Sequence, residues 1–271
     1  MKIRDWDDAF ANMAHIPGSE ALPAFWTERA QAYRDSGVSI EPDIAYGDDP
    51  RERFDLVWPD QTPNGLVVFI HGGYWMRLDK SYWTDLAEGA RAQGWVVCLP
   101  SYTLAPAARI QQITVQVGQA IALAAERVAG PIRLTGHSAG GHLATRMICA
   151  DTPLPGGTLK RVEHTLAISG LFDLRPLLHT QMNQTLKLDM AEATKESPAL
   201  VLAHGRPRLT TWVGGGERPE FIRQSRLMAQ IWDGLDAQTR CVVDSTHNHF
   251  TVLEGLKEPG STIVASLLGH G

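Results

Sequence analysis

Short apolar runs alternate with stretches of helical spacing over most of the chain. Seven runs are expected as strands, at residues 53–58, 66–70, 95–99, 132–135, 165–169, 209–213 and 240–243. Six stretches are expected as helices, at residues 22–33, 82–93, 114–128, 141–150, 220–233 and 261–268. Strands that alternate with helices in this way are typical of a mostly parallel central sheet covered by helices on both faces. The pattern therefore predicts the α/β fold class.

The length of 271 residues suits one large α/β domain spanning 1–271. No internal repeat and no linker-like tract divides the chain. Residues 172–204 lack a regular pattern and are expected to form loops and short helices above the sheet. Because ligands of open α/β folds bind beyond the carboxyl ends of the strands, we expect this insertion to cover the substrate pocket.

Composition and charge narrow the partners of the protein. The chain is 44% hydrophobic and 20% charged, and its net charge of −5 comes with no block of Lys or Arg. A nucleic-acid partner is therefore not expected, since such binding rests on a basic surface. The first eight residues lack an apolar core, so a signal peptide is not expected, and no apolar run is long enough to span a bilayer. The sequence predicts a soluble, cytoplasmic protein without a membrane partner.

The three cysteines are expected as free thiols. Cys98 and Cys241 fall in expected strands, and Cys149 falls in an expected helix. An odd number of cysteines in such elements favours buried thiols over disulfides.

The most informative motif is the pentapeptide GHSAG at 136–140. It follows the expected strand at 132–135 and precedes a helical stretch that begins at Gly141. A nucleophile elbow requires a strand, a sharp turn between glycines and a helix, because side chains in so tight a turn would collide with both elements. The same five letters occur by accident in many chains, so the flanking elements carry the argument. They predict that Ser138 is a strained, exposed nucleophile.

A second motif precedes the elbow in the chain. The strand at 66–70 runs directly into His71, Gly72 and Gly73. Acyl transfer passes through a tetrahedral oxyanion, which needs N–H donors already in place, and glycine lets the backbone approach the reacting carbonyl. We expect these donors to be the backbone N–H groups of Gly72, Gly73 and Ala139. An ordinary loop after a strand is the alternative, but it does not account for the order of the two motifs.

A serine hydroxyl becomes a good nucleophile only when a histidine takes its proton and an acid orients that histidine. In this arrangement the histidine comes last in the chain. His247, His249 and His270 lie beyond the last expected strand, and His270 belongs to the terminal tail. We expect His249 as the base because it stands at the end of its loop, with His247 as the runner-up. The H-x-H pair lacks a third ligand at metal spacing, so no metal is expected.

The acid is expected at the end of a strand that precedes the histidine. Glu217 follows the strand at 209–213 across three glycines, and glutamate is an allowed variant of the triad acid. An alternative role for Glu217 is a favourable charge in the first turn of the following helix. Asp173, at the end of an earlier strand, is the rival acid.

Three more histidines lie next to these motifs. His71 and His137 flank the site and are expected to orient loops by hydrogen bonding rather than to perform chemistry. His142 is expected to pack or to form hydrogen bonds under the site. None of the motifs calls for a cofactor.

These motifs together resemble the α/β-hydrolase family, and within it the kynurenine formamidase (arylformamidase) branch and its bacterial relatives. The matching stretches are HGGYW at 71–75, GHSAGGHLA at 136–144, SGLFDL at 169–174, ERPEF at 217–221 with QS at 224–225, and HF at 249–250. The elbow and HGG are shared with many esterases, whereas HGGYW and the stretch after the acid are more discriminating. The resemblance covers most of the chain from about residue 46 onward. It implies Ser138 as nucleophile, Glu217 as acid and His249 as base, although the family usually has aspartate where Glu217 stands.

The resemblance implies hydrolysis of an N-formyl aryl amine, with N-formyl-L-kynurenine as the reference substrate. Tyr74 and Trp75, with Trp83 nearby, are expected to form aromatic walls around the aryl group, although tryptophans at such positions also cap cores. A kynurenine-like substrate carries a carboxylate and needs a cationic partner. The candidates for this partner are Arg77, Lys80, Arg109 and Arg175.

Two other functions remain open. A carboxylesterase or thioesterase acting on small substrates would use the same groups, since only the pocket and the leaving group differ. A ligand-binding protein on a disabled hydrolase fold belongs to another class, and such proteins typically lack the serine or the histidine, which are both present here. The sequence therefore favours a cofactor-free serine hydrolase that forms an acyl-enzyme intermediate.

Overall fold

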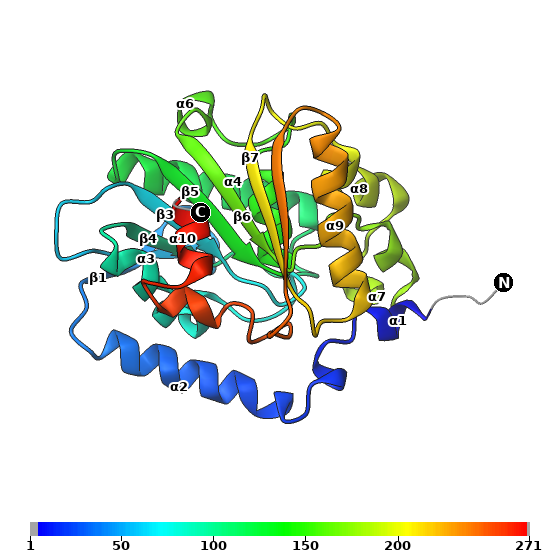
Figure 1. Ribbon diagram of the computed structural model, residues 1–271, viewed down its shortest axis with the longest axis horizontal. Helices are drawn as coiled ribbons and strands as arrows, with labels where there is room; N and C mark the ends of the chain where they lie inside the picture. The colour runs from blue at the N-terminus through cyan, green and yellow to red at the C-terminus, as the bar shows by residue number, and fades with distance from the viewer. Residues whose placement is uncertain (1–4, 270–271) are drawn as a thin grey trace.

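The computed structural model describes residues 5–269, which form an eight-stranded sheet between two layers of helices (Figure 1). The strands are β1 Ile40–Ala45, β2 Arg53–Val57, β3 Leu66–Ile70, β4 Val96–Pro100, β5 Ile132–His137, β6 Val162–Ile168, β7 Arg208–Gly214 and β8 Gln238–Asp244. Their order across the sheet is β1-β2-β4-β3-β5-β6-β7-β8. β2 pairs antiparallel with β1 and β4, and all other pairs are parallel. The expected mostly parallel sheet is therefore confirmed.

All seven expected strands are present, and their ends differ from the expected ones by at most three residues. The sequence missed β1, an edge strand whose residues are all exposed or half-buried. It contains Pro42 and Asp43, and its pairing with β2 shifts between Glu41 and Ile44. A proline and an irregular register are tolerated at a sheet edge, and such a strand lacks the apolar run that marks the others.

Helices cover both faces of the sheet. They are α1 Trp6–Ala9, α2 Leu22–Arg34, α3 Glu88–Ala92, α4 Ile110–Arg127, α5 Ala139–Arg146, α6 Gly156–Leu159, α7 Asn183–Leu186, α8 Met190–Lys195, α9 Pro219–Asp233 and α10 Thr262–Leu268. Short 3₁₀ turns occur at Met13–His15, Ser19–Ala21, Lys80–Tyr82, Thr84–Ala87, Arg175–His179, Pro198–Leu200 and Glu254–Lys257.

The structure corrects two of the expected helices. Residues 82–93 form 3₁₀ turns and the short α3, because the backbone of Trp83 leaves the helical region with φ −129° and ψ 11°. The helix expected at 141–150 is α5, which already ends at Arg146. Cys149 therefore lies beyond the helix and forms an isolated antiparallel bridge with Ala203. The chain leaves the helix here because its backbone groups bond to the neighbouring segment instead.

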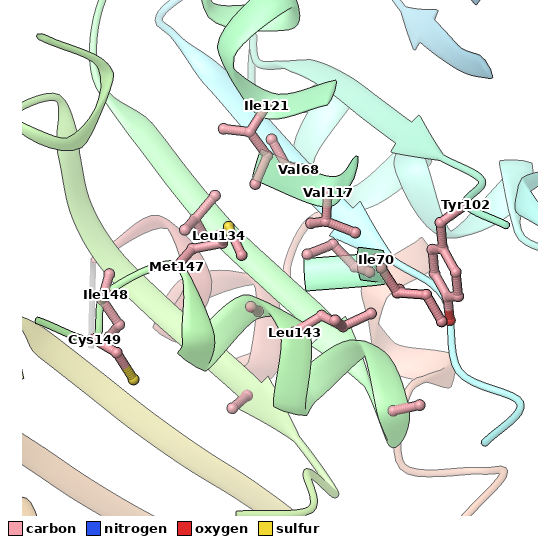
Figure 2. Packing of buried hydrophobic residues seen from close by; sticks show 14 of the residues in the cluster. Val68, Ile70, Tyr102, Val117, Ile121, Leu134, Leu143, Met147, Ile148 and Cys149 are labelled. Carbon is pink, nitrogen blue, oxygen red and sulfur yellow. The ribbon is translucent and has the colours of Figure 1, made fainter. Parts of the chain in front are cut away.

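The apolar run of β3 is buried on both faces of the sheet. Leu66, Val68 and Ile70 belong to a core shared with α4, α5 and α9, whereas Val67 and Phe69 belong to a core shared with α2, α3 and α10. Figure 2 shows the first core, in which side chains of β3 and β5 pack against α4 and α5. Each fully buried side chain of this size stabilises the fold by about 1.5–3 kcal/mol. β3 and β5 are thus firmly held, and their carboxyl ends carry the two motifs.

Residues 172–204 form loops and short helices, as expected. They include α7, α8 and two of the 3₁₀ turns. Leu174, Leu177 and Leu186 of this segment are buried in the first core, which anchors the segment to the rest of the fold. That the segment covers the substrate pocket stays a prediction.

All three cysteines are free, as expected. Cys98 and Cys149 are buried, whereas Cys241 is half-buried, so the expectation of a buried thiol is wrong for Cys241. Within residues 5–269, no helix is both long and apolar enough to cross a membrane.

Candidate active site

Ser138 lies in a sharp turn between β5 and α5. Its backbone has φ 56° and ψ −117°, a conformation that costs a residue with a side chain about 1–3 kcal/mol. Two hydrogen bonds hold the turn: the Ser138 N–H donates to the Ile168 carbonyl at 2.8 Å, and the His142 N–H donates to the Ser138 carbonyl at 3.1 Å. The strained turn is as expected, but the expectation of an exposed serine is wrong, because Ser138 is only 2% exposed.

The glycines on either side of Ser138 are required by close backbone contacts. A Cβ atom on Gly136 would lie 2.3 Å from the Gly140 carbonyl oxygen. A Cβ atom on Gly140 would lie 1.9 Å from the Ile70 carbonyl oxygen at the end of β3. Real Cβ atoms do not approach oxygen so closely, so only glycine allows β3, β5 and α5 to meet at this point.

The HGG loop after β3 lies directly against the elbow. A Cβ atom on Gly72 would lie 3.1 Å from the Ser138 Cβ atom. Gly73 has φ 104°, and a Cβ atom there would lie 2.3 Å from the Arg77 carbonyl oxygen. Ala139 is the first residue of α5, where backbone N–H groups have no partner within the helix. The backbones of Gly72 and Ala139 thus lie next to the serine, and Gly73 follows in the same loop.

A buried carboxylate–imidazole pair forms where β7 and β8 end. The His249 Nδ1 atom lies 2.6 Å from Glu217 Oε2, and the two side chains are 3% and 0% exposed. The other carboxylate oxygen, Glu217 Oε1, accepts hydrogen bonds from Ser169 Oγ at 2.6 Å and from the Gly214 N–H at 2.7 Å. Three contacts therefore fix this carboxylate, and its geometry lets it orient the His249 ring.

The rival residues lie elsewhere. Asp173 forms a bidentate ion pair with Arg175. Burial acts to raise the pKa of the Asp173 carboxyl, but the hydrogen bonds from Arg175 outweigh this effect and hold that pKa below its usual value. His247 is half-buried, with Nε2 3.8 Å from Asp244 Oδ2. His270 lies outside the described residues. Among residues 5–269, no three His, Cys, Asp or Glu side chains gather closely enough to hold a metal ion.

A strained serine in a strand–turn–helix elbow, beside a glycine loop and in the same chain as a buried carboxylate–imidazole pair, is the arrangement of a serine hydrolase fold. The model of the alpha/beta hydrolase family matches residues 67–268. The chain belongs to this family.

Relatives of this hydrolase include formamidases and esterases. Kynurenine formamidase of Danio rerio is 27% identical over 251 residues, which cover 89% of this hydrolase and 84% of that protein. The crystal structure of a candidate thioesterase from Silicibacter sp. TM1040 is 43% identical, with a TM-score of 0.92 over 98% of this chain and 100% of that one. An esterase of Pyrobaculum calidifontis has a TM-score of 0.73 over 93% of each chain, and at 16% identity it shows the fold alone. The expected α/β-hydrolase fold, the hydrolase class and the similarity to kynurenine formamidases are confirmed.

Three further histidines of the hydrolase are buried. Burial lowers the pKa of His71 to about 4 and that of His142 to about 3, and it lowers the pKa of His137 well below the usual value. These rings are therefore neutral near pH 7. His137 Nε2 donates to the His249 carbonyl oxygen at 2.8 Å, and the two rings lie 4.6 Å apart. His71 and His142 also donate to backbone carbonyl oxygens, at 2.7 Å, so all three orient loops by hydrogen bonds.

Trp75 and Trp83 follow the HGG loop in the sequence but lie in hydrophobic cores on opposite faces of the sheet. Trp75 has no exposed surface and packs edge-on against His142 at 5.1 Å in the first core. Trp83 packs on Trp26 at 4.7 Å in the second core, on the opposite face of the sheet. Tyr74 is half-buried, and its hydroxyl group contacts the N-terminal segment. That Tyr74 and Trp75 bind substrate stays a prediction.

Four residues are candidates to bind a substrate carboxylate, and three of them form ion pairs with carboxylates of the hydrolase itself. Lys80 pairs with Asp43 and Asp55, Arg109 pairs with Glu192, and Arg175 pairs with Asp173. Arg77 is exposed on the loop that follows β3 and forms no ion pair within the part of the chain that the structure describes. Arg77 is thus the candidate that keeps its charge available to an incoming carboxylate.

Two residues near the pair were not singled out from the sequence. Ser169, which donates to Glu217, stands directly after β6 in a left-handed conformation with φ 50°. Its position at the end of the strand next to the elbow strand is a signal that could have found it. Phe10 contacts Phe221, whose ring contacts His249, but Phe10 is far away in the sequence and no local pattern marks it.

Proposed function

We propose that this hydrolase removes a small acyl group from an N-formyl aryl amide, with N-formylkynurenine as the model substrate, through Ser138, His249 and Glu217. The observation that carries the proposal is the 2.6 Å contact between His249 Nδ1 and Glu217 Oε2. A hydrogen on Nδ1 that is donated to the carboxylate leaves Nε2 as an acceptor. An acceptor at Nε2 is what a general base for the serine needs.

The reaction proceeds in two halves. His249 Nε2 takes the proton of Ser138 Oγ as this oxygen attacks the formyl carbon, and the N–H groups of Gly72, Gly73 and Ala139 stabilise the resulting oxyanion. The C–N bond then breaks as His249 gives the proton to the departing arylamine, which leaves a formyl ester on Ser138. Water attacks this ester with His249 as base, and formate leaves as Ser138 regains its proton. Glu217 accepts the hydrogen bond of the imidazolium ring and stabilises it in both halves.

Similarity favours the formamide as the substrate class. The Danio rerio relative is a kynurenine formamidase that aligns over 89% of this chain, and the HGGYW stretch points to the same branch. The alternative is a carboxylesterase or thioesterase, which the 43% identity to the Silicibacter candidate thioesterase favours. A non-catalytic binding protein is the remote alternative, and the intact set of serine, acid and histidine argues against it.

Turnover of three substrates by one purified sample tests the proposal. N-formylkynurenine, p-nitrophenyl acetate and an acetyl thioester present a formamide, an ester and a thioester to the same site. We expect kcat/KM to be highest for the formamide, measured as the release of formate and of the free amine. Brisk cleavage of the ester or the thioester without cleavage of the formamide would contradict the formamidase assignment and support the alternative.

We expect the Glu217→Gln substitution to lower kcat by about 10⁴-fold. Oε1 accepts from Ser169 and Gly214, so the amide oxygen of glutamine takes that place and its NH₂ group faces His249 Nδ1. The ring must then carry its hydrogen on Nε2, where it can no longer accept the proton of Ser138. The measurement is kcat together with the melting temperature Tm.

The matched control is Asp173→Asn, which makes the same chemical change in the rival acid. We expect it to leave kcat within about threefold, since the Asp173 carboxylate pairs with Arg175 rather than with His249. Equal losses of kcat in the two variants would contradict the assignment of Glu217.

A further inference from the structure

The N-terminal segment of residues 5–12 packs against Phe221, the residue of α9 whose ring contacts His249. Phe10 of this segment is 2% exposed, and its ring meets the Phe221 ring edge-on at 6.0 Å. The Phe221 ring in turn lies 4.6 Å from the ring of His249. An unbroken path of aromatic contacts therefore joins the N-terminal segment to the imidazole of the Glu217–His249 pair.

The same segment is tied to the oxyanion loop. The Tyr74 hydroxyl group donates to the Phe10 carbonyl oxygen at 2.6 Å and accepts from Asn12 Nδ2 at 3.3 Å. Burial raises the pKa of Tyr74, so this hydroxyl keeps its hydrogen and remains a donor. Tyr74 directly follows Gly73, whose N–H is one of the proposed oxyanion donors. Phe10 is thus held between the loop that carries those donors and the helix α9 that carries Phe221.

The segment also forms polar contacts with the start of α9, next to which α1 lies in Figure 1. The Arg218 guanidinium pairs with the Asp8 carboxylate, and Arg218 Nε donates to the Asp8 carbonyl oxygen at 3.1 Å. A cavity of about 510 Å³ lies between the N-terminal segment and the start of α9. Its lining includes Asp8, Ala9, Arg218 and Arg223. The Asp8 and Arg218 side chains are 48% and 22% exposed, and ion pairs exposed to this extent add little to stability. The buried ring of Phe10 therefore contributes more to holding the segment than this ion pair does.

We propose that residues 5–12 form a cap over the reacting groups, and that Phe10 is the residue of this cap that selects the leaving group. Ser138 and His249 are each 2% exposed, so a substrate reaches them only when part of their cover moves. When the cap closes again, the rings of Phe10 and Phe221 face the substrate on the side of His249, where the leaving group takes its proton. Two aromatic edges at this place favour an aryl leaving group over a small alkyl one. The inference rests on the proposed function and deepens it.

The test compares leaving groups while the acyl group stays the same. Phenyl acetate and ethyl acetate pass through the same acetyl-enzyme, and formanilide and N-ethylformamide pass through the same formyl-enzyme. We expect Phe10→Ala to lower kcat/KM for both aryl substrates about tenfold, mainly through KM, and for both ethyl substrates less than threefold. Phe10→Leu, which keeps an apolar side chain, is expected to lie between the wild type and Phe10→Ala.

One control and one further test variant accompany this series. Phe25→Ala makes the same substitution in α2 at a side chain that is 52% exposed, and we expect no change for any of the four substrates. Tyr74→Phe keeps the ring but removes the hydroxyl that holds Phe10, and we expect a weaker loss of the same aryl preference. If Phe10→Ala does not fold, as judged by circular dichroism, Phe10→Leu and Tyr74→Phe carry the test.

The outcomes are distinguishable. Equal losses for aryl and ethyl substrates would mean that Phe10 only supports the fold, and would overturn the inference. Equal gains in kcat/KM for all four substrates would mean that the segment only blocks access to the site without selecting the leaving group. This result would also overturn the inference. A wild type that cleaves none of the four substrates contradicts the proposed function itself, and the inference fails with it.

Discussion

Ser138→Ala is expected to lower kcat by about 10⁶-fold, because it removes the atom that forms the acyl-enzyme. The variant keeps a Cβ atom at φ 56° and ψ −117°, so the strain of the elbow and the fold around it stay the same. We therefore expect Tm to change by no more than about 2 °C, since no buried apolar contact is lost. The measurements are kcat on the best substrate, Tm, and covalent labelling by a fluorophosphonate probe.

Labelling gives this prediction a readout that does not depend on the natural substrate. The wild type should be labelled at one serine, and Ser138→Ala should not be labelled. Ser36→Ala, which changes an exposed serine in the turn after α2, is the matched control and should behave like the wild type. A wild type that is not labelled, or a Ser138→Ala variant that is, would rule out Ser138 as the nucleophile and leave the binding-protein alternative standing.

The second large effect is expected at His249. His249→Ala should lower kcat by about 10⁶-fold, because neither the proton of Ser138 nor that of the leaving group then has a carrier. It also leaves the Glu217 carboxylate buried without its partner, so we expect a loss of stability of about 1–3 kcal/mol as well. Measuring Tm separates the two effects, and His249→Gln, which can still donate to Glu217, should lose activity with a smaller loss of stability.

His247→Ala is the control for His249→Ala. Its ring is half-buried, with Nδ1 3.2 Å from Thr251 Oγ1, and it does not contact the Glu217 carboxylate. We expect kcat to stay within about fivefold of the wild type, as is usual for a residue outside the reacting groups. Similar losses at the two histidines would mean that the base has been assigned wrongly.

The sequence was informative wherever the backbone itself demands a residue type. Gly136 and Gly140 mark the elbow because no Cβ atom fits between β3, β5 and α5. Strands β3 and β4 were found because both of their faces are buried, which leaves a continuous apolar run in the sequence. The same reasoning missed β1, whose exposed edge position needs no such run, and it merged the turns around Trp83 into one helix.

By itself the sequence determined the fold class, the family resemblance and the place of the elbow serine, because each depends on residues that are neighbours in the chain. Only the tertiary structure brought Glu217 rather than Asp173 into contact with His249, since that contact joins loops from β7 and β8 that are 32 residues apart. Only the tertiary structure brought Phe10 beside the same site, across more than 200 positions of sequence. Distances between such segments are set by the packing of the sheet and its helices, and no local pattern of residues encodes them.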